Sequence, residues 1–457
     1  MILNARSNSL IHKSLKQSAC PGISLSSPIE ILKTLHLITK WGVYFFTAFW
    51  YNRLIVKMTI STNSQKIKDI LERGVEDVIV KEHLEEALKS GRQLRVKFGI
   101  DPTGPKIHLG RASTLSKLKA FQDLGHLIVL IIGDFTATIG DPSDKLSKRP
   151  TLTKEQVKKN MRDYAKQIGK LLDMDKVELR YNSKWLEKLN LKDIGELAEC
   201  FSFQQMAARR NFKERVDRGE DVSMREMLYP LMQGYDSVAV KSDVEVGGFD
   251  QLFNLKAGRA IQKQYGQPEQ DILTTQMIEG TDGRKMSTSW GNVITIVDEP
   301  KDMFGKIMAI KDELILKYFW LCTNVTQDEL DEYQKRLEKG ANPRDIKMEL
   351  GKKIVALYHS AGAAKNAALE FEKVFSKKEL PTEMPEYLAP AGEMTLLDII
   401  MNAKLAKSKS DARRTISQKG VRIDSRVTDD ALASLKIHQD GIVLQYGKKT
   451  FVRVKVK

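Results

Sequence analysis

Cysteine is scarce in this chain, and its distribution excludes two common ways of stabilising a fold. Cys20, Cys200 and Cys322 are the only three among 457 residues. They lie too far apart for a disulfide framework or for the ligand spacing of a zinc site. We therefore expect no metal held by the protein. We also predict a cytoplasmic location, because disulfides are rare in that reducing compartment.

Long hydrophobic runs are missing as well. The most apolar stretch is WGVYFFTAFW at residues 41–50, and Lys40 and Arg53 bracket it closely. A helix needs about 20 consecutive apolar residues to cross a bilayer, so this stretch is too short. The sequence therefore predicts no membrane partner.

Acidic residues are almost absent from residues 1–57, where seven Lys and Arg accompany a single acid, Glu30. A basic, acid-poor start that contains serines can be a transit-like leader. Alternatively, translation begins at Met58, because the sequence after it is typical of an ordinary amphipathic N-terminus. We favour the second interpretation and expect residues 1–57 to be an extension that is untranslated or disordered.

Negative charge is also outnumbered in the chain as a whole, with 59 Asp and Glu against 74 Lys and Arg. Such an excess favours a polyanionic partner mainly where it is concentrated in one folded unit. Residues 394–457 carry 14 Lys and Arg against six acids, which is about half of the net charge of +15. Two short helices, at 395–403 and 409–418, and several short strands are predicted there. The tail is therefore expected to be a small α+β unit that binds RNA.

From Gln93 onward, strand and helix signals alternate along the chain. Thr153 and Gln156 form a capping box that begins one of the helices. This rhythm predicts a Rossmann-like, doubly wound parallel sheet of the α/β class. The predicted strands are 93–100, 126–133, 176–183, 243–248 and 271–277, and the helices are 112–125, 153 to about 172, and 250–264.

The domain boundaries follow from changes in pattern. Residues 297–376 have helical periodicity without strands, and residues 377–394 contain three prolines and few aliphatic side chains. We therefore expect an N-terminal extension (1–57), a domain that holds the parallel sheet and inserted connective helices (58–296), a separate α-helical domain (297–376), a linker (377–393) and the small RNA-binding domain (394–457).

Three polar loops follow predicted strands, where ligands bind in open parallel sheets. GIDPTGPKIHLGR (99–111) opens into a helix whose first N–H groups suit phosphate. IGDPSD (139–144) offers Asp141, and EGTDGRKMSTSWGN (279–292) offers several cationic and hydroxyl donors. Taken singly, each is equally typical of an ordinary loop: a capping histidine, a turn aspartate or a solvated basic turn.

A fourth segment, SMREMLYPLMQGYDSVAV (223–240), is more distinctive. Ser223 and Glu226 predict a capped helix start. Tyr229, Gln233 and Asp236 then fall on one helical face, and such a polar face suits a binding site better than a core. Pro230 is expected to kink this helix near its start.

Together these segments resemble the tyrosyl-tRNA synthetases of the bacterial type, from about residue 60 to the C-terminus. GIDPTGPKIHLGR is similar to the HIGH region of class I aminoacyl-tRNA synthetases, and KMSTS (285–289) is similar to their KMSKS loop. YPLMQGYD (229–236) and GGFDQ (247–251) resemble the tyrosine-pocket segments. The tail from residue 394 resembles an S4-like RNA-binding domain. The joint order and spacing are specific, although each motif alone is weak.

The resemblance implies a role for each matching residue. Asp236 would receive the substrate phenol, Gln251 would lie near its carboxylate and Asp250 would bind the ribose. The implied tyrosine-binding residues are Lys97, Asp141, Tyr229, Gln233, Asp236 and Gln251. The implied ATP-binding residues are Gly99, Asp101, Thr103, His108, Gly110, Asp250, Lys285, Met286 and Ser287. The implied catalytic residues are His108, Arg111, Lys285 and Thr288, and the RNA contacts are Lys409, Arg413, Arg414, Lys419 and Arg422.

The implied reaction is that of a tyrosine–tRNA ligase. ATP activates L-tyrosine to tyrosyl-adenylate with release of pyrophosphate, and tyrosine then passes to the 3′ end of tRNA(Tyr). Mg²⁺ is expected only as the companion of ATP, and a homodimer is expected from the resemblance alone. Because the substrate carboxylate is already ionised, positioning and charge stabilisation must supply the catalysis.

Four positions depart from the family pattern. Arg111 replaces the second histidine of HIGH, and Thr288 replaces the second lysine of KMSKS. Phe249 occupies a position that is usually small and polar, and Lys97 stands where some members have tyrosine. Our hypothesis is that Arg111 partly compensates for the missing lysine, because a guanidinium can bind phosphate oxygens in a bidentate way.

Two alternatives differ from this interpretation. A tryptophanyl-tRNA synthetase shares the fold, but the S4-like tail and the face formed by Tyr229, Gln233 and Asp236 favour tyrosine. A non-catalytic RNA-binding protein on the same scaffold would explain the two altered motifs. The joint presence of His108 and Lys285 with the tyrosine-pocket residues argues against it.

Overall fold

The computed structural model describes residues 60–143, 152–376, 384–390, 392–437, 441–447 and 450–457. The chain divides into Met1–Ile60 and Ser61–Lys457, and the second unit contains every element discussed below. The predicted extension at 1–57 lies outside the described residues. Across the described helices, none is long and apolar enough to cross a membrane.

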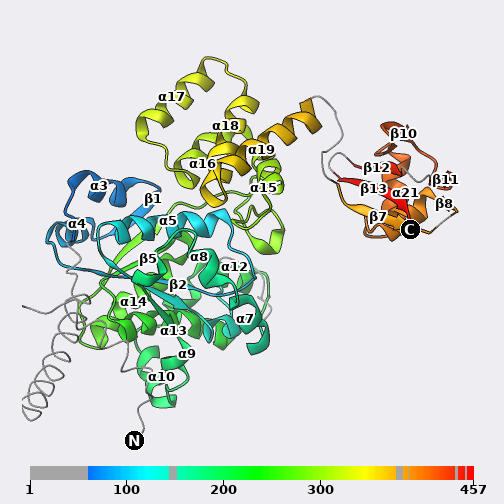
Figure 1. Ribbon diagram of the computed structural model, residues 1–457. Helices are drawn as coiled ribbons and strands as arrows, with labels where there is room; N and C mark the ends of the chain where they lie inside the picture. Colours follow the sequence, from blue (N-terminus) through cyan, green and yellow to red (C-terminus); the bar gives the residue numbers. More distant parts are fainter. Residues whose placement is uncertain (1–59, 144–151, 377–383, 391, 438–440, 448–449) are drawn as a thin grey trace, which may run out of the picture. The chain divides into compact units, whose positions relative to one another are not determined.

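A six-stranded sheet forms the centre of the catalytic region, with strand order β1-β6-β5-β2-β3-β4 (Figure 1). All neighbouring strands are parallel except the edge pair β1 and β6, which is antiparallel. The strands are β1 (Val75–Ile79), β2 (Arg95–Ile100), β3 (Leu127–Ile132), β4 (Val177–Tyr181), β5 (Val244–Gly248) and β6 (Asp271–Thr275). The chain moves outward from β2 on one side and from β5 on the other, so the topological switch point lies between β2 and β5.

Alternating side chains of β3 explain why helices cover both faces of this sheet. Ile128, Leu130 and Ile132 join the core that includes α5 (Leu109–Asp123), whereas Val129 and Ile131 pack with Val240 on the opposite face. Helices α13 (Met224–Val240) and α14 (Leu252–Gln264) lie on that second face (Figure 1). The predicted doubly wound architecture is confirmed.

Helix α13 begins with the predicted capping box of Ser223 and Glu226. It continues through Pro230 as one helix, so the proline does not end it. A single helix from Thr153 to about Leu172 was predicted, and this prediction is wrong. The chain instead forms α7 (Lys154–Met161) and α8 (Tyr164–Ile168), although the capping box at Thr153 is present.

The break between α7 and α8 has a visible cause in the loop that precedes α5. The Tyr164 hydroxyl donates to the carbonyl of Gly104, and Gln167 Nε2 donates to the carbonyl of Pro105. These bonds fix α8 against the loop and override the continuous helical pattern of the sequence. The edge strand β1 and the helices α3 (Ser64–Glu72) and α4 (Lys81–Lys89) also precede the first strand that the sequence predicted.

The connective segment after β4 consists of four short helices: α9 (Ser183–Leu186), α10 (Leu191–Ala198), α11 (Phe203–Ala207) and α12 (Arg210–Asp217). After β6 and the loop that follows, the chain is helical and without strands up to residue 376, as the periodicity predicts. Its α-helices are α15 (Pro300–Met308), α16 (Ile315–Cys322), α17 (Gln327–Glu338), α18 (Pro343–Tyr358) and α19 (Ala361–Phe371).

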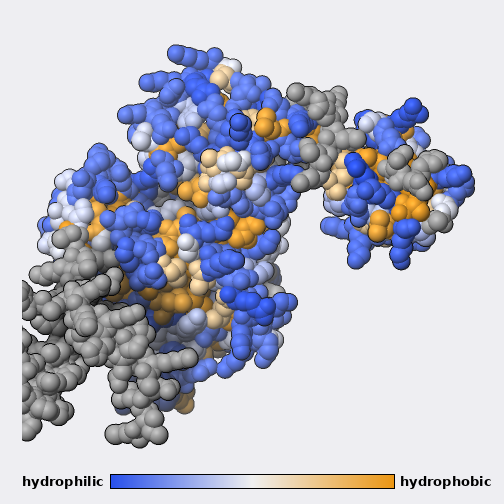
Figure 2. Space-filling model, in the orientation of Figure 1, coloured by the Kyte–Doolittle hydropathy of each residue, from blue (hydrophilic) through white to orange (hydrophobic). Residues whose placement is uncertain are grey.

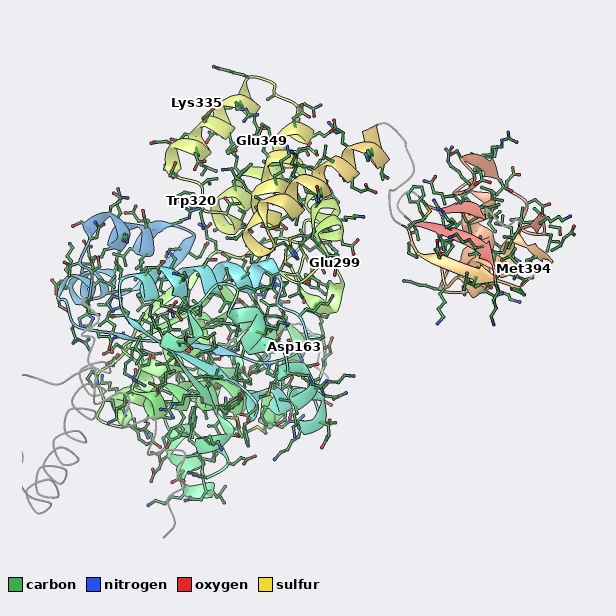
Figure 3. The ribbon with its side chains drawn as sticks, viewed as in Figure 1. Asp163, Glu299, Trp320, Lys335, Glu349 and Met394 are labelled. Atoms are coloured by element: carbon green, nitrogen blue, oxygen red, sulfur yellow. The ribbon has the colours of Figure 1, made fainter. Side chains whose placement is uncertain are left out.

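The helical segment shares its hydrophobic core with the sheet region. The Arg73 guanidinium lies 4.3 Å from the ring centroid of Trp320, which is labelled in Figure 3. The same side chain donates to the main-chain carbonyls of Trp320, Thr323 and Val325. The two regions are thus joined by continuous packing.

The C-terminal residues have a hydrophobic core of their own. Two helices, α20 (Leu396–Asn402) and α21 (Lys409–Ser417), confirm the predicted pair. They pack with a five-stranded sheet of order β10-β9-β12-β13-β7 and with the pair β11-β8. The strands are β7 (Glu386–Ala389), β8 (Glu393–Thr395), β9 (Val421–Ile423), β10 (Arg426–Thr428), β11 (Ser434–Lys436), β12 (Ile442–Tyr446) and β13 (Thr450–Val456). Strand β7 pairs with β13, so the segment that was expected to be a linker contributes a strand to this fold.

Candidate active site

A cavity of about 410 Å³ lies at the switch point, beyond the carboxyl ends of the strands. Every candidate residue for tyrosine, ATP and catalysis except Lys97 lines it. These residues are Gly99, Asp101, Thr103, His108, Gly110, Arg111, Asp141, Tyr229, Gln233, Asp236, Asp250, Gln251, Lys285, Met286, Ser287 and Thr288. Five segments far apart in the sequence therefore meet around one space.

Asp236 occupies a fully enclosed position in this wall. Its Oδ1 accepts a hydrogen bond of 2.7 Å from Trp185 Nε1, and its Oδ2 accepts one of 3.3 Å from Asn182 Nδ2. Burial raises the pKa of the Asp236 carboxyl to about 7, against the opposing influence of the Lys97 ammonium. The carboxylate is thus held in place, and its charge state changes near neutral pH.

Lys97 lies behind the cavity wall and forms a buried ion pair. Its Nζ is 2.9 Å from Glu245 Oε1, and the two side chains are 0% and 1% exposed. The ammonium also donates to the carbonyl of Gln233 and to Ser237 Oγ. The structure therefore places Lys97 against α13 and β5, outside the surface that a substrate touches.

A network of amides and carboxylates connects α13 with the loop after β3. Asn254 Nδ2 donates 3.0 Å bonds to Gln233 Oε1 and to Gln251 Oε1. Gln251 Nε2 donates to Asp141 Oδ2 over 2.6 Å. Gln233, Asp141 and Gln251, predicted from three separate segments, are thereby brought together.

Asp101 connects this amino-acid end of the cavity to the loop before α5. Its Oδ2 accepts a 2.8 Å bond from the Tyr229 hydroxyl, and its Oδ1 accepts a 2.7 Å bond from Thr136 Oγ1. A Cβ atom on Gly133 would lie only 2.0 Å from Asp101 Oδ1. Glycine at 133 is therefore required for Asp101 to sit here.

His108 caps the start of α5 and faces two cations across the cavity. Burial, Arg111 and Lys285 together lower the pKa of His108 to about 3, so its imidazole is neutral at physiological pH. Its Nδ1 is buried and has no hydrogen-bond partner among the residues that the structure describes. A Cβ on Gly110 would lie 3.1 Å from this nitrogen, which explains why glycine follows two residues after the histidine.

The Arg111 guanidinium binds the loop that precedes α5 and a tyrosine of α8. Its Nη1 donates to Tyr164 OH over 3.0 Å and to the carbonyl of Asp101 over 3.3 Å, and its Nη2 donates to Thr103 Oγ1 over 3.1 Å. These three acceptors are neutral oxygen atoms. These hydrogen bonds therefore leave the positive charge of the guanidinium unneutralised at the cavity wall.

The loop between β6 and α15 closes the other side of the cavity. Lys285 Nζ forms a 2.8 Å ion pair with Asp250 Oδ2, and both side chains are about a quarter exposed, at 28% and 21%. A Cβ on Gly104 would contact the Thr288 methyl at 3.4 Å. Thr288 therefore lies against the loop that carries His108.

Four functional positions were missed by sequence reasoning: Asn182, Trp185, Glu245 and Asn254. Two signals could have found some of them. Asn182 lies near the end of the strand predicted at 176–183 and directly follows the observed β4, where a polar side chain reaches the ligand edge. Glu245 is a charged residue in the middle of a buried parallel strand, where near-continuous apolar runs are typical. No signal identified Trp185 or Asn254, because their partners come from other segments.

Known proteins match this chain in sequence over most of its length. Residues 89–376 match the family described as tRNA synthetases class I (W and Y). Residues 376–454 match the C-terminal domain of the tyrosine–tRNA ligases. The tyrosine–tRNA ligase of Thermotoga maritima is 46% identical over 396 residues, which cover 86% of this chain and 98% of the relative. The chain belongs to the tyrosine–tRNA ligase family.

A second ligase of the family, from Carboxydothermus hydrogenoformans, is 45% identical and is covered over 97% of its length, with 84% of this chain aligned. Solved structures agree on the fold. A C-terminally truncated mitochondrial tyrosyl-tRNA synthetase of Aspergillus nidulans has a TM-score of 0.56 at 22% identity, covering 68% of this chain and 94% of its own. The synthetase of Archaeoglobus fulgidus, solved with L-tyrosine, has a TM-score of 0.54 at 24% identity, covering 67% and 99%.

The C-terminal domain, which this ligase family carries, holds the candidate RNA contacts. Hydrophilic side chains cover much of its face in Figure 2. Arg414 is paired with Asp411, and Arg422 donates to the carbonyl of Ser425. All five candidates are exposed: Lys409, Arg413 and Arg414 on α21, Lys419 after it and Arg422 on β9.

Proposed function

We propose that the cavity activates L-tyrosine with ATP and then passes the tyrosyl group to tRNA(Tyr). One observation carries this proposal. A buried carboxylate, Asp236, and a set of phosphate-compatible donors around His108 and Lys285 line the same cavity. A phenol and a triphosphate can thus be held at once, with the reacting carboxylate and α-phosphate between them.

At the amino-acid end, Asp236 accepts the hydroxyl proton of the phenol in a hydrogen bond. Tyr229, Gln233 and Asp141 hold the α-ammonium, and Gln251 lies toward the carboxylate. Before substrate binds, Gln251 already donates to Asp141, Asn254 connects Gln233 to Gln251, and Tyr229 donates to Asp101. Such preorganisation lowers the entropy cost of holding tyrosine in a reactive orientation.

At the nucleotide end, Asp250 binds the ribose, and the backbone from Gly99 to Gly110 approaches the phosphates. The tyrosine carboxylate attacks the α-phosphorus, the bond to the bridging oxygen breaks, and pyrophosphate leaves. No proton is transferred in this step. His108 therefore acts as a neutral hydrogen-bonding group, while Lys285 and Arg111 stabilise the charge that develops on pyrophosphate.

Mg²⁺ enters the site bound to ATP in this proposal, and it supplies charge neutralisation at the phosphates. The described part of the chain has no group of three His, Cys, Asp or Glu side chains that could hold a metal ion. The phosphate oxygens, rather than the protein, are thus its expected ligands.

The second step requires the 3′ end of tRNA(Tyr) at the same cavity. For tRNA phosphates away from this 3′ end, we propose contacts with five cationic residues: Lys409, Arg413, Arg414, Lys419 and Arg422. The proposed division of labour is catalysis by residues 58–296, tRNA contacts by residues 297–376, and further RNA binding by the C-terminal domain. The location proposed for this reaction is the cytoplasm.

A homodimer is also proposed, and a group of exposed apolar side chains supports it. Leu191, Phe203, Val216 and Met224 are strongly exposed, and all lie in or just after the connective helices. We propose that these side chains gather into one apolar surface, because contiguous exposed apolar patches mark protein–protein contacts. Sedimentation of the protein and of a Phe203→Glu, Met224→Glu variant tests this, and a dimeric variant would contradict the assignment.

Amino-acid-dependent exchange of pyrophosphate into ATP tests the main proposal. We expect exchange with tyrosine and none with tryptophan or phenylalanine at comparable concentrations. Exchange with tryptophan would favour the tryptophanyl alternative. No exchange by a folded protein that still binds tRNA would favour a non-catalytic RNA-binding protein.

A further inference from the structure

Outside the residues assigned to substrates, one cluster of charged side chains is completely enclosed. Lys97 on β2 and Glu245 on β5 are direct cross-strand partners. Their side chains point away from solvent, and Nζ lies 2.9 Å from Oε1. Burying two charges in this way is expensive, and replacing such a pair with apolar side chains is often neutral or stabilising. A role other than stability therefore needs to be considered.

Every remaining polar partner of this pair connects it to α13 or fixes it in place. Lys97 donates to the Gln233 carbonyl over 2.8 Å and to Ser237 Oγ over 2.7 Å. Glu245 Oε1 accepts a 3.2 Å bond from the Gln233 side chain, and Oε2 accepts bonds from Ser237 Oγ and Gln270 Nε2. The pair thus holds both the backbone and the side chain of Gln233.

The packing of α14 is shaped around the same cluster. A Cβ atom on Gly258 would lie 2.4 Å from Gln270 Nε2, 2.8 Å from Ser237 Oγ and 3.2 Å from Glu245 Oε2. A glycine in the middle of a helix is less favourable than alanine, because it loses more backbone freedom on folding. Helix α14 therefore has a less stabilising residue at 258, and the missing side chain leaves room for the cluster.

From these contacts we infer that Lys97 and Glu245 are positioning residues for tyrosine recognition, fixing Gln233 and setting the charge environment of Asp236. The inference rests on the proposed assignment of Gln233 and Asp236 to tyrosine. Neither residue of the pair takes part in the chemical step. Lys97 is covered by the wall. Glu245 lines the cavity but is only 1% exposed, and it fixes the Gln233 amide by accepting its hydrogen bond.

The charges around Asp236 move the pKa of its carboxyl in a definite direction. The groups that face Asp236 are Lys97 from β2, Glu245 from β5, and Trp185 and Asn182 from the segment after β4. Lys97 lowers the pKa of the Asp236 carboxyl more strongly than Glu245 raises it. Removing both charges should therefore raise this pKa and shift tyrosine binding to higher pH.

The decisive variant is the double substitution Lys97→Met, Glu245→Gln, which leaves no uncompensated buried charge. We expect it to fold, to raise the KM for tyrosine about tenfold and to change the KM for ATP less than about twofold in pyrophosphate exchange. The acid limb of kcat/KM for tyrosine should move to higher pH. A folded double variant with the parent KM and the parent pH limb would overturn the inference, as would an equal rise in both KM values.

A matched control exists between α12 and α13. Arg215 and Glu226 form another buried ion pair, with a 3.0 Å separation and side chains that are 2% and 7% exposed. The variant Arg215→Met, Glu226→Gln should keep the parent tyrosine KM and pH limb. If it shows the same changes as the first double variant, loss of any buried ion pair that contacts α13 is sufficient and the inference fails.

Two further measurements complete the test. If the first double variant is not recovered folded, Ser237→Ala decides, because it removes the hydroxyl that joins Lys97 to Glu245 without changing a charge. We then expect the tyrosine KM to rise about threefold, and an unchanged value contradicts the inference. Gln233→Ala and Asp236→Ala separate the two proposals: unchanged tyrosine KM values would refute the assignment of the site itself.

Discussion

The two ends of the cavity are built differently. At the amino-acid end, Asp236 and Glu245 are 3% and 1% exposed, and each makes several hydrogen bonds to residues of helices and strands. At the nucleotide end, Lys285 and Asp250 are about a quarter exposed and belong to loops or to a short 3₁₀ turn. One end is fixed by the core, and the other is formed by segments at the surface.

This difference matches two physical tasks. Selecting one amino acid requires buried polar groups that are left unsatisfied when the wrong side chain enters. Accepting ATP and releasing pyrophosphate requires charges that can be solvated before and after the reaction. We therefore expect substitutions at the buried end to alter selection and KM for tyrosine, and those at the exposed end to alter the rate.

Lys285→Met should have the largest effect on rate. Loss of a charged donor to the leaving pyrophosphate is expected to lower kcat for adenylate formation by about 10²–10³-fold, with little change in the KM for tyrosine. Single-turnover fluorescence or pyrophosphate exchange measures this. Arg284→Met is the neighbouring control, because Arg284 is paired with Asp282 and stacks on Trp290. A loss of tyrosine affinity in Lys285→Met would contradict the proposed division between the two ends of the cavity.

Asp236→Asn should have the next largest effect. The aspartate accepts at both oxygens, from Trp185 and from Asn182, and an asparagine has only one oxygen to offer. Loss of a charged, buried acceptor costs about 3 kcal/mol, or roughly a hundredfold in kcat/KM for tyrosine. The ratio of tyrosine to phenylalanine activation should fall with it, and an unchanged ratio would contradict the assignment.

The pH dependence of Asp236 gives a third comparison. Because its pKa is about 7, kcat/KM for tyrosine should fall about tenfold per pH unit below that value, as the carboxylate is protonated. Stability has the opposite sign. A folded-state pKa above the unfolded value means that the contribution of this group is present at low pH and is lost as pH rises to about 7. Urea unfolding of the parent and of Asp236→Asn across this range measures the difference.

Arg111→His tests the altered motif and should have a smaller effect. The imidazole is too short to reach Thr103, Tyr164 and the Asp101 carbonyl together, and it is weakly charged at neutral pH. We expect adenylate formation to slow about tenfold. Tyr164→Phe is the control that removes one of these bonds and keeps the cation. Parent or faster adenylate formation in Arg111→His would refute compensation for the lysine missing at Thr288.

Substitutions in the C-terminal domain should have the smallest effect on the reaction at the cavity. Arg413→Ala, Arg414→Ala should weaken tRNA binding and reduce its salt dependence by about two counterions, because two phosphate contacts are lost. Pyrophosphate exchange without tRNA should remain as in the parent. A Glu393→Ala variant of the same domain serves as control. An unchanged salt dependence would remove these arginines from the RNA-binding surface.

Much of the nucleotide end was predictable because its segments are local. The loop glycines and a helix after them follow from the local pattern, although the helix begins at Leu109 rather than at the predicted residue 112. At the amino-acid end, the polar face of Tyr229, Gln233 and Asp236 follows from helical spacing. The parallel sheet likewise follows from the alternation of segments. The fold class and the family resemblance were confirmed, while the individual roles of the site residues stay predictions.

The remainder depended on contacts between distant segments. Lys97 was expected beside the phenol, but its partner Glu245 draws it behind the wall, and only the β2–β5 pairing reveals this. The break between α7 and α8 arises from bonds to the loop at 104–105. Strand β7 lies between prolines and was not predicted. It is defined by its pairing with β13, more than 60 residues later in sequence.

The Lys97–Glu245 pair has a consequence for how the sheet assembles. In the native alignment Val96 lies opposite Val244, and Lys97 lies opposite Glu245. Shifting β5 by one residue along β2 would place a lone lysine against valine in a dry interior and would send Glu245 to the other face of the sheet. The pair therefore penalises misaligned folding intermediates, and the chain can specify the central register of its sheet with two charges rather than with a longer strand.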